Sequence, residues 1–226
     1  MSSRSPSDPL SYPTAESPAC ERNRQPILER LRPALAHSRH VLEIGSGTGQ
    51  HAVFFAPALP HLLWQASDRA EWLPGLRARI AREGAGKLPP PIELDVTANP
   101  WPLPAGTAVP PVDAVFTANT LHIMGWPAVE AFFAGVGRLL AASGDTRTAG
   151  ANPRRVLAVY GPFRYRGAFT SASNAAFDAT LRQRDPASGI RDFEAVDALA
   201  AAQGLALEAD HAMPANNQLL LWGAAA

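Results

Sequence analysis

Three glycines spaced two residues apart follow a short apolar run in the segment Val41–Gln50, which reads VLEIGSGTGQ. Gly45, Gly47 and Gly49 allow the backbone to turn sharply and leave room for a ligand against bare main chain. A helix that begins directly after them points its free N–H groups into the same space. The pattern therefore predicts a binding site for a nucleotide-type ligand.

The spacing of these glycines separates this loop from two better-known phosphate-binding loops. Dinucleotide-binding folds carry Gly-x-Gly-x-x-Gly, which has two residues between its second and third glycines where this loop has one. A phosphate-hydrolysing loop needs a lysine after its last glycine, whereas Gln50 and His51 follow here. Taken alone, the loop is also compatible with a tight strand-to-helix turn in another α/β domain.

Polar residues end the three apolar runs that follow, and this context favours the ligand site. Residues 62–67 end at Asp68, nineteen residues after Gly49, where the second strand of a doubly wound sheet presents a carboxylate to a ribose diol. Asp95 and Val96 follow the run at 91–94, and Asn119 follows the run at 113–118. The carboxyl ends of parallel strands form one edge, so we expect these groups to face one crevice.

The remaining elements complete the predicted fold. We expect helices at 26–31, 127–140, 173–184 and 192–203, the last capped by Asp192, a fifth strand at 156–160 and two final strands at 205–208 and 218–222. A loop is expected at 143–155. The alternation predicts an α/β, Rossmann-like, doubly wound sheet of seven strands, mostly parallel, with an antiparallel C-terminal edge pair and helices on both faces. Residues 1–16 form a predicted disordered tail and residues 17–226 a single domain.

Composition narrows the classes of partner. Lys plus Arg and Asp plus Glu both number 20, so no basic excess favours nucleic acid. No run of eighteen apolar residues and no secretory signal is evident, which predicts a cytoplasmic protein with no membrane segment. The single cysteine, Cys20, excludes an internal disulfide framework, and the six histidines form no ligand pattern that requires a metal.

The glycine loop and the acids after it resemble the class I S-adenosylmethionine-dependent methyltransferases. The resemblance implies S-adenosyl-L-methionine as the cofactor and S-adenosyl-L-homocysteine as its product. It implies that the loop holds the methionine part, that Asp68 binds the ribose hydroxyls and that Asp95 approaches the adenine. The cofactor residues implied in this way are Glu43, Gly45, Ser46, Gly47, Gly49, Asp68, Asp95, Val96 and Asn119.

Four further segments resemble a family of small methyltransferase-like proteins of unassigned function. They are SPACERN at 17–23, SGTGQH at 46–51, YGPF at 160–163 and MPANN at 213–217. The resemblance runs from about Ser17 to the C-terminus. It implies a cofactor and leaves the substrate open.

Two residues after the central strands are candidates for catalysis. His122 is the candidate general base because an imidazole titrates near neutral pH, and Tyr160 could hold a substrate oxygen. Methyl transfer needs the nucleophile in line with the sulfur–methyl bond, and a base only if the nucleophile arrives protonated. Alternatively, His122 is a hydrogen-bonded core histidine and Tyr160 merely ends a strand.

Candidate substrate residues lie around the same edge: Arg22, Asn23, Arg164, Tyr165, Asn174 and Asn216. The stretch 164–171 alternates cations and aromatic residues, which indicates a lid over the substrate. Arginines there could clamp a carboxylate or a phosphate, and an ion-pair network with Asp185 and Asp192 is an equal alternative. Asn216 also fits a hairpin turn.

The sequence therefore predicts a methyltransferase that transfers a methyl group from S-adenosylmethionine to a small, polar acceptor, which is anionic if the arginines bind it. One alternative is a non-catalytic cofactor-binding or interaction protein with this fold. A nicotinamide-dependent oxidoreductase is the other, and the short glycine spacing argues against it. The acceptor atom and the oligomeric state are left open.

Overall fold

The computed structural model describes residues 16–103, 109–143 and 155–224. The predicted N-terminal tail, apart from residue 16, lies outside these ranges, and so does most of the loop expected at 143–155. The helices are α1 Pro18–Ala34, α2 Gln50–Ala58, α3 Leu73–Glu83, α4 Trp126–Ser143, α5 Ala172–Arg184, α6 Phe193–Ala201 and the 3-10 turn η1 Pro214–Asn216. The strands are β1 His40–Ile44, β2 Leu63–Asp68, β3 Ile92–Glu93, β4 Ala114–Ala118, β5 Val156–Gly161, β6 Phe163–Tyr165, β7 Ala168–Phe169, β8 Arg191–Asp192, β9 Leu205–Met213 and β10 Asn217–Ala224.

The main sheet has seven strands in the order β3-β2-β1-β4-β5-β10-β9. β10 runs antiparallel to both β5 and β9, and the pairs among the other five strands are parallel. This confirms the predicted Rossmann-like sheet and its antiparallel C-terminal pair. The strand order reverses between β1 and β4, and a doubly wound sheet binds its ligand outside the carboxyl ends of the strands at such a point.

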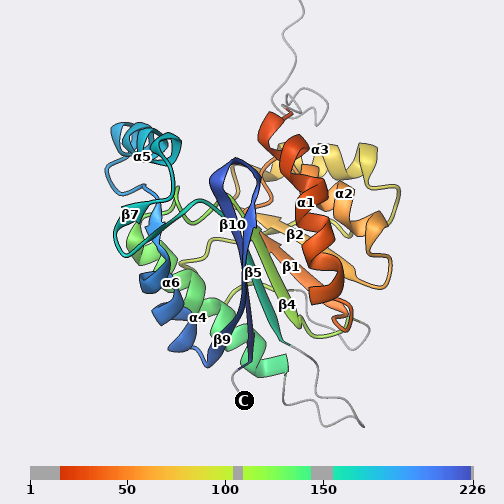
Figure 1. Cartoon of the computed structure of the whole chain (residues 1–226). Coiled ribbons are helices and arrows are strands. Elements are labelled where there is room, and N and C mark those ends of the chain that lie inside the picture. The colour runs from red at the N-terminus through yellow and green to blue at the C-terminus, as the bar shows by residue number, and fades with distance from the viewer. Residues whose placement is uncertain (1–15, 104–108, 144–154, 225–226) are drawn as a thin grey trace, which may run out of the picture.

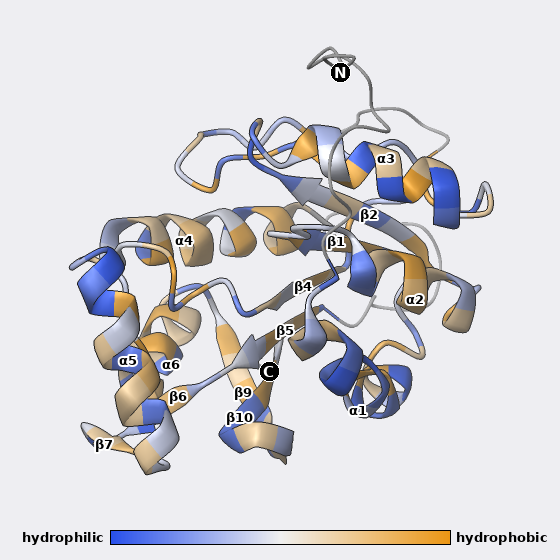
Figure 2. Cartoon of the chain, turned by 90° about the horizontal axis from the view of Figure 1, so that it is seen from above, coloured by the Kyte–Doolittle hydropathy of each residue, from blue (hydrophilic) through white to orange (hydrophobic). Residues whose placement is uncertain are grey.

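Helices cover both faces of this sheet, as Figure 1 shows with α1, α2 and α3 on one side and α4 and α6 on the other. One apolar cluster includes Val41 and Phe116, and the other includes Leu42 and Val115, so successive residues of β1 and β4 point into opposite layers. Figure 2 looks onto the edge where the parallel strands end and shows the sheet between the two layers. Burial on both faces explains why these strands are mostly apolar and show no alternation of apolar and polar residues.

Helix α1 begins eight residues earlier than the sequence indicated. Ser17 is its N-cap, accepting a hydrogen bond from the Cys20 amide over 3.4 Å, and Pro18 fills the first helical position. Pro26, which was expected to open the helix, lies inside it. Arg22 and Asn23 therefore belong to the helix rather than to a segment preceding it.

A second, three-stranded sheet in the order β7-β6-β8 was not predicted. The stretch expected to act as a lid forms the β6–β7 hairpin, whose turn residues Arg166 and Gly167 have φ values of 53° and 76°. Asp192 precedes α6 but its side chain does not cap the helix. It forms an ion pair with Arg164, with 2.5 Å between Nη2 and Oδ2, and this pairing replaces the expected cap.

None of the helices in the described ranges combines the length and the apolar character needed to span a membrane.

Candidate active site

The glycine loop between β1 and α2 has an open side at its middle residue. Gly45, Gly47 and Gly49 have φ values of 72°, 54° and 78°. A Cβ atom built on Gly45 would lie 2.8 Å from Oγ1 of Thr120, and one on Gly49 would lie 2.7 Å from Cδ1 of Leu76. A Cβ on Gly47 would meet nothing within 4 Å. Side chains at Gly45 or Gly49 would thus have to displace the neighbouring side chains of Thr120 or Leu76, whereas Gly47 borders open space.

Asp68, at the carboxyl end of β2, holds this loop from the side. Its Oδ2 accepts a hydrogen bond from the Gly47 amide over 2.6 Å, and its Oδ1 accepts one from the Arg69 amide over 2.8 Å. Burial raises the pKa of the carboxyl, while both amides oppose the rise. The acid that the sequence placed at the end of the second strand therefore contacts the glycine loop directly.

Glu43 lies beneath the loop and is only 2% exposed. Its Oε2 accepts a hydrogen bond from Trp64 Nε1 over 2.8 Å. Burial raises the pKa of Glu43 from 4.5 to about 7, against the lowering effect of hydrogen bonds from Trp64 and Ser46. At neutral pH a substantial share of this carboxyl is protonated.

The raised pKa of Glu43 predicts a pH-dependent stability. The folded state binds the proton more tightly than the unfolded state, so this stability is fully present below pH 4.5 and is lost as the pH rises to about 7. The variant Glu43→Gln keeps an acceptor for Trp64 and lacks the titration. The difference in free energy of unfolding, variant minus wild type, should therefore be about 3 kcal/mol larger at pH 8 than at pH 4. Denaturant unfolding of both proteins at several pH values measures this gain, and a pH-independent difference would contradict it.

The first turns of α1 pack onto the glycine loop through Gln50, the first residue of α2. The Ser17 amide donates to Gln50 Oε1 over 2.7 Å, and Gln50 Nε2 donates to Glu21 Oε1 over 3.3 Å. One turn further, Asn23 Oδ1 lies 2.8 Å from Nε2 of the buried His51, with which it hydrogen-bonds. The segments at 17–23 and 46–51 are thus one hydrogen-bonded unit.

Tyr160 connects the segments at 160–163 and 213–217 to the segment at 17–23. Its ring is buried at the end of β5, and the side-chain amides of Asn217 and Asn23 are hydrogen-bond partners of its hydroxyl. Burial raises the pKa of Tyr160, so the hydroxyl is protonated at neutral pH. Asn174 on α5 donates from Nδ2 to the carbonyl of Asn216 over 2.9 Å and holds the turn that carries Asn217. All four segments quoted from the sequence therefore contribute to one polar cluster.

His122 lies in the turn between β4 and α4, across from the end of β5. Its ring is buried, meets the ring of Phe177 edge-on at 5.3 Å between centroids, and would lie 3.8 Å from a Cβ on Gly161. Burial, with a smaller effect of the Arg191 charge, lowers the pKa of His122 to about 4. Among the described residues, no hydrogen bond contributes to this pKa.

The other predicted cofactor residues follow the carboxyl ends of β3 and β4. Asp95 is exposed after β3, and its Oδ1 accepts hydrogen bonds from the amide and the hydroxyl of Thr97 over 2.8 and 2.7 Å. These bonds lower the pKa of Asp95. Val96 is buried beside it, and Asn119 after β4 has a φ of 58° with its amide bonded to the Tyr160 carbonyl. Their role toward a cofactor stays a prediction.

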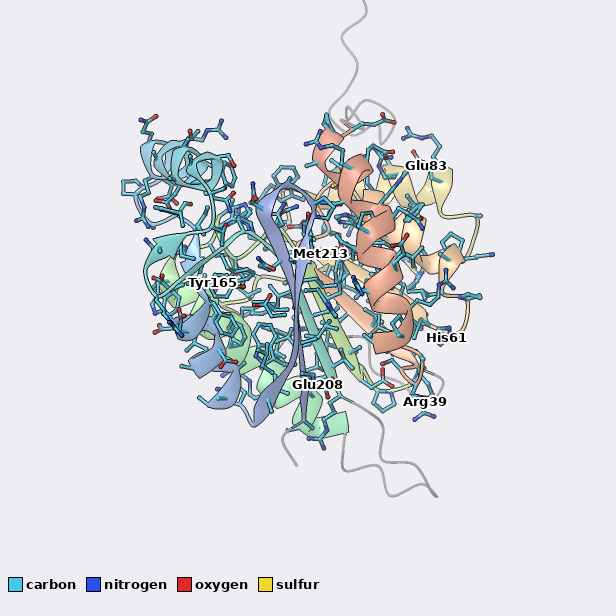
Figure 3. All side chains as sticks on the ribbon, viewed as in Figure 1. Arg39, His61, Glu83, Tyr165, Glu208 and Met213 are labelled. Carbon is cyan, nitrogen blue, oxygen red and sulfur yellow. The ribbon has the colours of Figure 1, made fainter. Side chains whose placement is uncertain are left out.

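Two predicted substrate residues direct their polar atoms elsewhere. Arg164 is paired with Asp192, which matches the ion-pair alternative at this position. Tyr165 donates its hydroxyl to Asp210 on β9 over 2.6 Å and stacks on Phe193. Figure 3 shows Tyr165 on the α6 side of the sheet, across from α1. Arg22, by contrast, is exposed on α1 and its charge acts on Tyr160.

The polar cluster also contains three residues that were absent from the predicted site: Gln50, His51 and Asn217. Each belongs to one of the four quoted segments, so the signal was present in the sequence. In the described part of the chain, no three His, Cys, Asp or Glu side chains gather as a metal site.

Comparison with known proteins identifies a family and a fold. A family model described as "Protein of unknown function (DUF938)" matches residues 14–224. An O-methyltransferase family protein from Burkholderia thailandensis superposes with a TM-score of 0.70 at 15% identity, over 89% of this chain and 56% of that one. The O-methyltransferase NcsB1 of neocarzinostatin biosynthesis, solved with S-adenosylmethionine and 2-hydroxy-5-methyl naphthoic acid, superposes with a TM-score of 0.66 at 19% identity, over 91% and 54%.

A third neighbour is a putative O-methyltransferase from Nostoc punctiforme, with a TM-score of 0.70 at 16% identity over 88% of this chain and 55% of that one. The chain thus spans about half the length of these solved structures. At such identities the likeness establishes the fold, which is that of class I methyltransferases.

Proposed function

The chain belongs to the DUF938 family of proteins of unknown function, and we propose that it is an S-adenosylmethionine-dependent methyltransferase acting on a small, polar acceptor. The observation that carries this proposal is the open space beside Gly47. Gly47 follows β1, at the point where the strand order reverses, and its amide donates to the carboxylate of Asp68. Ligands of doubly wound sheets bind at this point.

The residues at this edge fit S-adenosylmethionine. Gly47 leaves the room that a side chain would fill, and the glycine loop would hold the methionine part of the cofactor. Asp68 would accept hydrogen bonds from the ribose hydroxyls, since each oxygen has accepting capacity beyond its one amide partner. Asp95, exposed at the end of the next strand, would face the adenine. When bound, the cofactor supplies a methyl group on a positively charged sulfur.

The chain's own residues would orient the acceptor and keep water out. The Tyr160 hydroxyl, flanked by Asn23 and Asn217, offers a hydrogen bond to an acceptor oxygen or nitrogen. The neutral His122 ring has a nitrogen lone pair that can take the proton of a protonated nucleophile. Because its low pKa makes it a weak base, we assign most of the catalysis to positioning. Arg22, exposed near Tyr160, would attract an acceptor that carries a negative charge.

Transfer of a labelled methyl group tests the proposal. Purified protein is incubated with S-adenosylmethionine that carries a 13C-labelled methyl group and with a fraction of small polar metabolites, and products are read by mass spectrometry. We expect a labelled small molecule together with an equal amount of S-adenosylhomocysteine. A protein that binds the cofactor but transfers no label to metabolites, including the anionic ones, would contradict an enzymatic role and favour a binding protein. The variant Tyr160→Phe, which retains the ring, reports on the hydroxyl.

A further inference from the structure

The turn that carries His122 is held by one other segment of the chain. Four consecutive carbonyls of this turn accept hydrogen bonds from the segment Ser188–Arg191, which lies between α5 and α6. Arg191 Nε donates to Leu121 over 3.1 Å, the Gly189 amide to His122 over 2.9 Å, Ser188 Oγ to Ile123 over 3.2 Å and Arg191 Nη2 to Met124. The carbonyls of His122 and of its neighbours on either side are thus hydrogen-bonded from outside the turn.

Arg191 contributes two of these four bonds although its burial is costly. The residue is 9% exposed, and Nη2 also donates to the carbonyl of Ala187 over 2.9 Å. Among the described residues no carboxylate lies within ion-pair distance of it. A buried charge without a paired carboxylate destabilises a fold unless its hydrogen bonds compensate. Here the direct partners are main-chain carbonyls, which ties the guanidinium to the geometry of the turn, and the charges of Asp178 and Asp185 add support at longer range.

Helix α5 fixes the segment Ser188–Arg191, which donates these hydrogen bonds. Asp178 accepts a hydrogen bond from the Ile190 amide over 2.7 Å and another from Arg182 Nε over 2.7 Å. A Cβ on Gly189 would lie 2.9 Å from Asp178 Oδ1 and 2.6 Å from Arg182 Nη2, so any other residue would have to displace these two side-chain ends. The same helix provides Phe177, whose ring meets His122 edge-on. The turn, the donor segment and α5 form one connected unit around the imidazole.

We propose that Arg191 is a positioning residue that fixes the turn at 121–124 and thereby holds the His122 ring toward the acceptor site. The proposal rests on the function proposed above, in which His122 meets the acceptor. Arg191 acts through the main chain and does not touch the reacting atoms. Among the described residues, Arg191 is also the one charged side chain that acts on the His122 ring. Its positive charge disfavours the protonated imidazole.

The test is an NMR pH titration of the His122 ring in the full-length protein, with His122→Gln used to assign its signals. We expect the wild-type ring to stay neutral down to about pH 4 and to keep its contact with Phe177. In Arg191→Gln the ring should titrate closer to the usual 6.5 and lose that contact. Arg191→Lys, which keeps the charge but has no forked donors, should restore neither the contact nor the low pKa fully, because burial of the ring is the larger cause of that pKa.

Two controls separate this proposal from the proposed function. Arg166→Gln, in the exposed β6–β7 turn, should leave the ring signals unchanged. Binding of S-adenosylhomocysteine should change less than twofold in Arg191→Gln, because Arg191 makes no contact with the glycine loop. Unchanged titration and an unchanged Phe177 contact in Arg191→Gln would overturn the positioning role whatever the protein binds. If that variant does not fold, Arg191→Lys decides: weakening of the Phe177 contact supports the role, and an unchanged contact overturns it.

Discussion

Replacing Gly47 with valine should lower the affinity for S-adenosylmethionine by about a hundredfold or more, equivalent to about 2.7 kcal/mol. A Cβ at this position meets no protein atom within 4 Å, so the new side chain would extend into the space assigned to the methionine part of the cofactor. The branched side chain has few rotamers with which to turn aside. Calorimetric titration of the variant measures the loss.

The effect of backbone strain must be distinguished from the effect of blocking the cofactor. Gly47 has a φ of 54°, which disfavours valine in any surroundings. Gly204 provides a matched control. Its φ is 73°, a Cβ there also meets nothing within 4 Å, and it follows α6 rather than the candidate site. Gly204→Val should therefore lose a similar stability, about 1 to 2 kcal/mol, and keep its cofactor affinity. Wild-type affinity in Gly47→Val would refute the placement of the cofactor.

Asp68→Ala is expected to weaken cofactor binding by about ten- to a hundredfold, which corresponds to roughly 1.5 to 3 kcal/mol for a charge-assisted hydrogen bond. The substitution removes the proposed partner of the ribose hydroxyls. It also leaves the Gly47 and Arg69 amides without their acceptor, so the glycine loop loses a lateral support. Titration of the variant with S-adenosylhomocysteine measures the effect on binding.

Asp68→Asn tests whether charge matters beyond shape. Each carboxylate oxygen faces an amide donor, so the asparagine NH2 group must face one N–H whichever way it is turned. We expect this variant to lose nearly as much affinity as the alanine variant. Glu71→Gln, an exposed change three residues away, is the control and should bind normally. Equal affinity in Asp68→Asn and wild type would remove Asp68 from the proposed site.

Much of the central sheet was predictable from sequence because its signals are local. β1, β2, β4 and β5 lie between helical layers on both faces, which makes each a mostly apolar run that is followed by, or ends in, glycine or a polar residue. The predicted start of α1 at Pro26 is wrong because Ser17 and Pro18 carry the same N-terminal signal eight residues earlier. The small sheet was missed because its strands have two or three residues, and β6 pairs with β8 across 28 positions of sequence.

In the candidate site too, local features were predictable from the sequence and contacts between distant segments were not. The glycine loop and Asp68 follow from spacing within a single βαβ unit, and the structure places them in contact. The cluster around Tyr160 required four distant segments to meet, which motif resemblance indicated and periodicity could not. Nothing in the sequence distinguishes Arg191 from the other arginines near it. Its role depends on carbonyls about 70 residues away, which only the folded chain brings within reach.

Calorimetric titration of the purified protein with S-adenosylmethionine, S-adenosylhomocysteine and NADH tests the central claim most directly. The account predicts micromolar binding of the first two ligands and no binding of NADH, because the glycine loop is one residue shorter than that of dinucleotide-binding folds. Binding of NADH without S-adenosylmethionine, or of none of the three, would contradict the account.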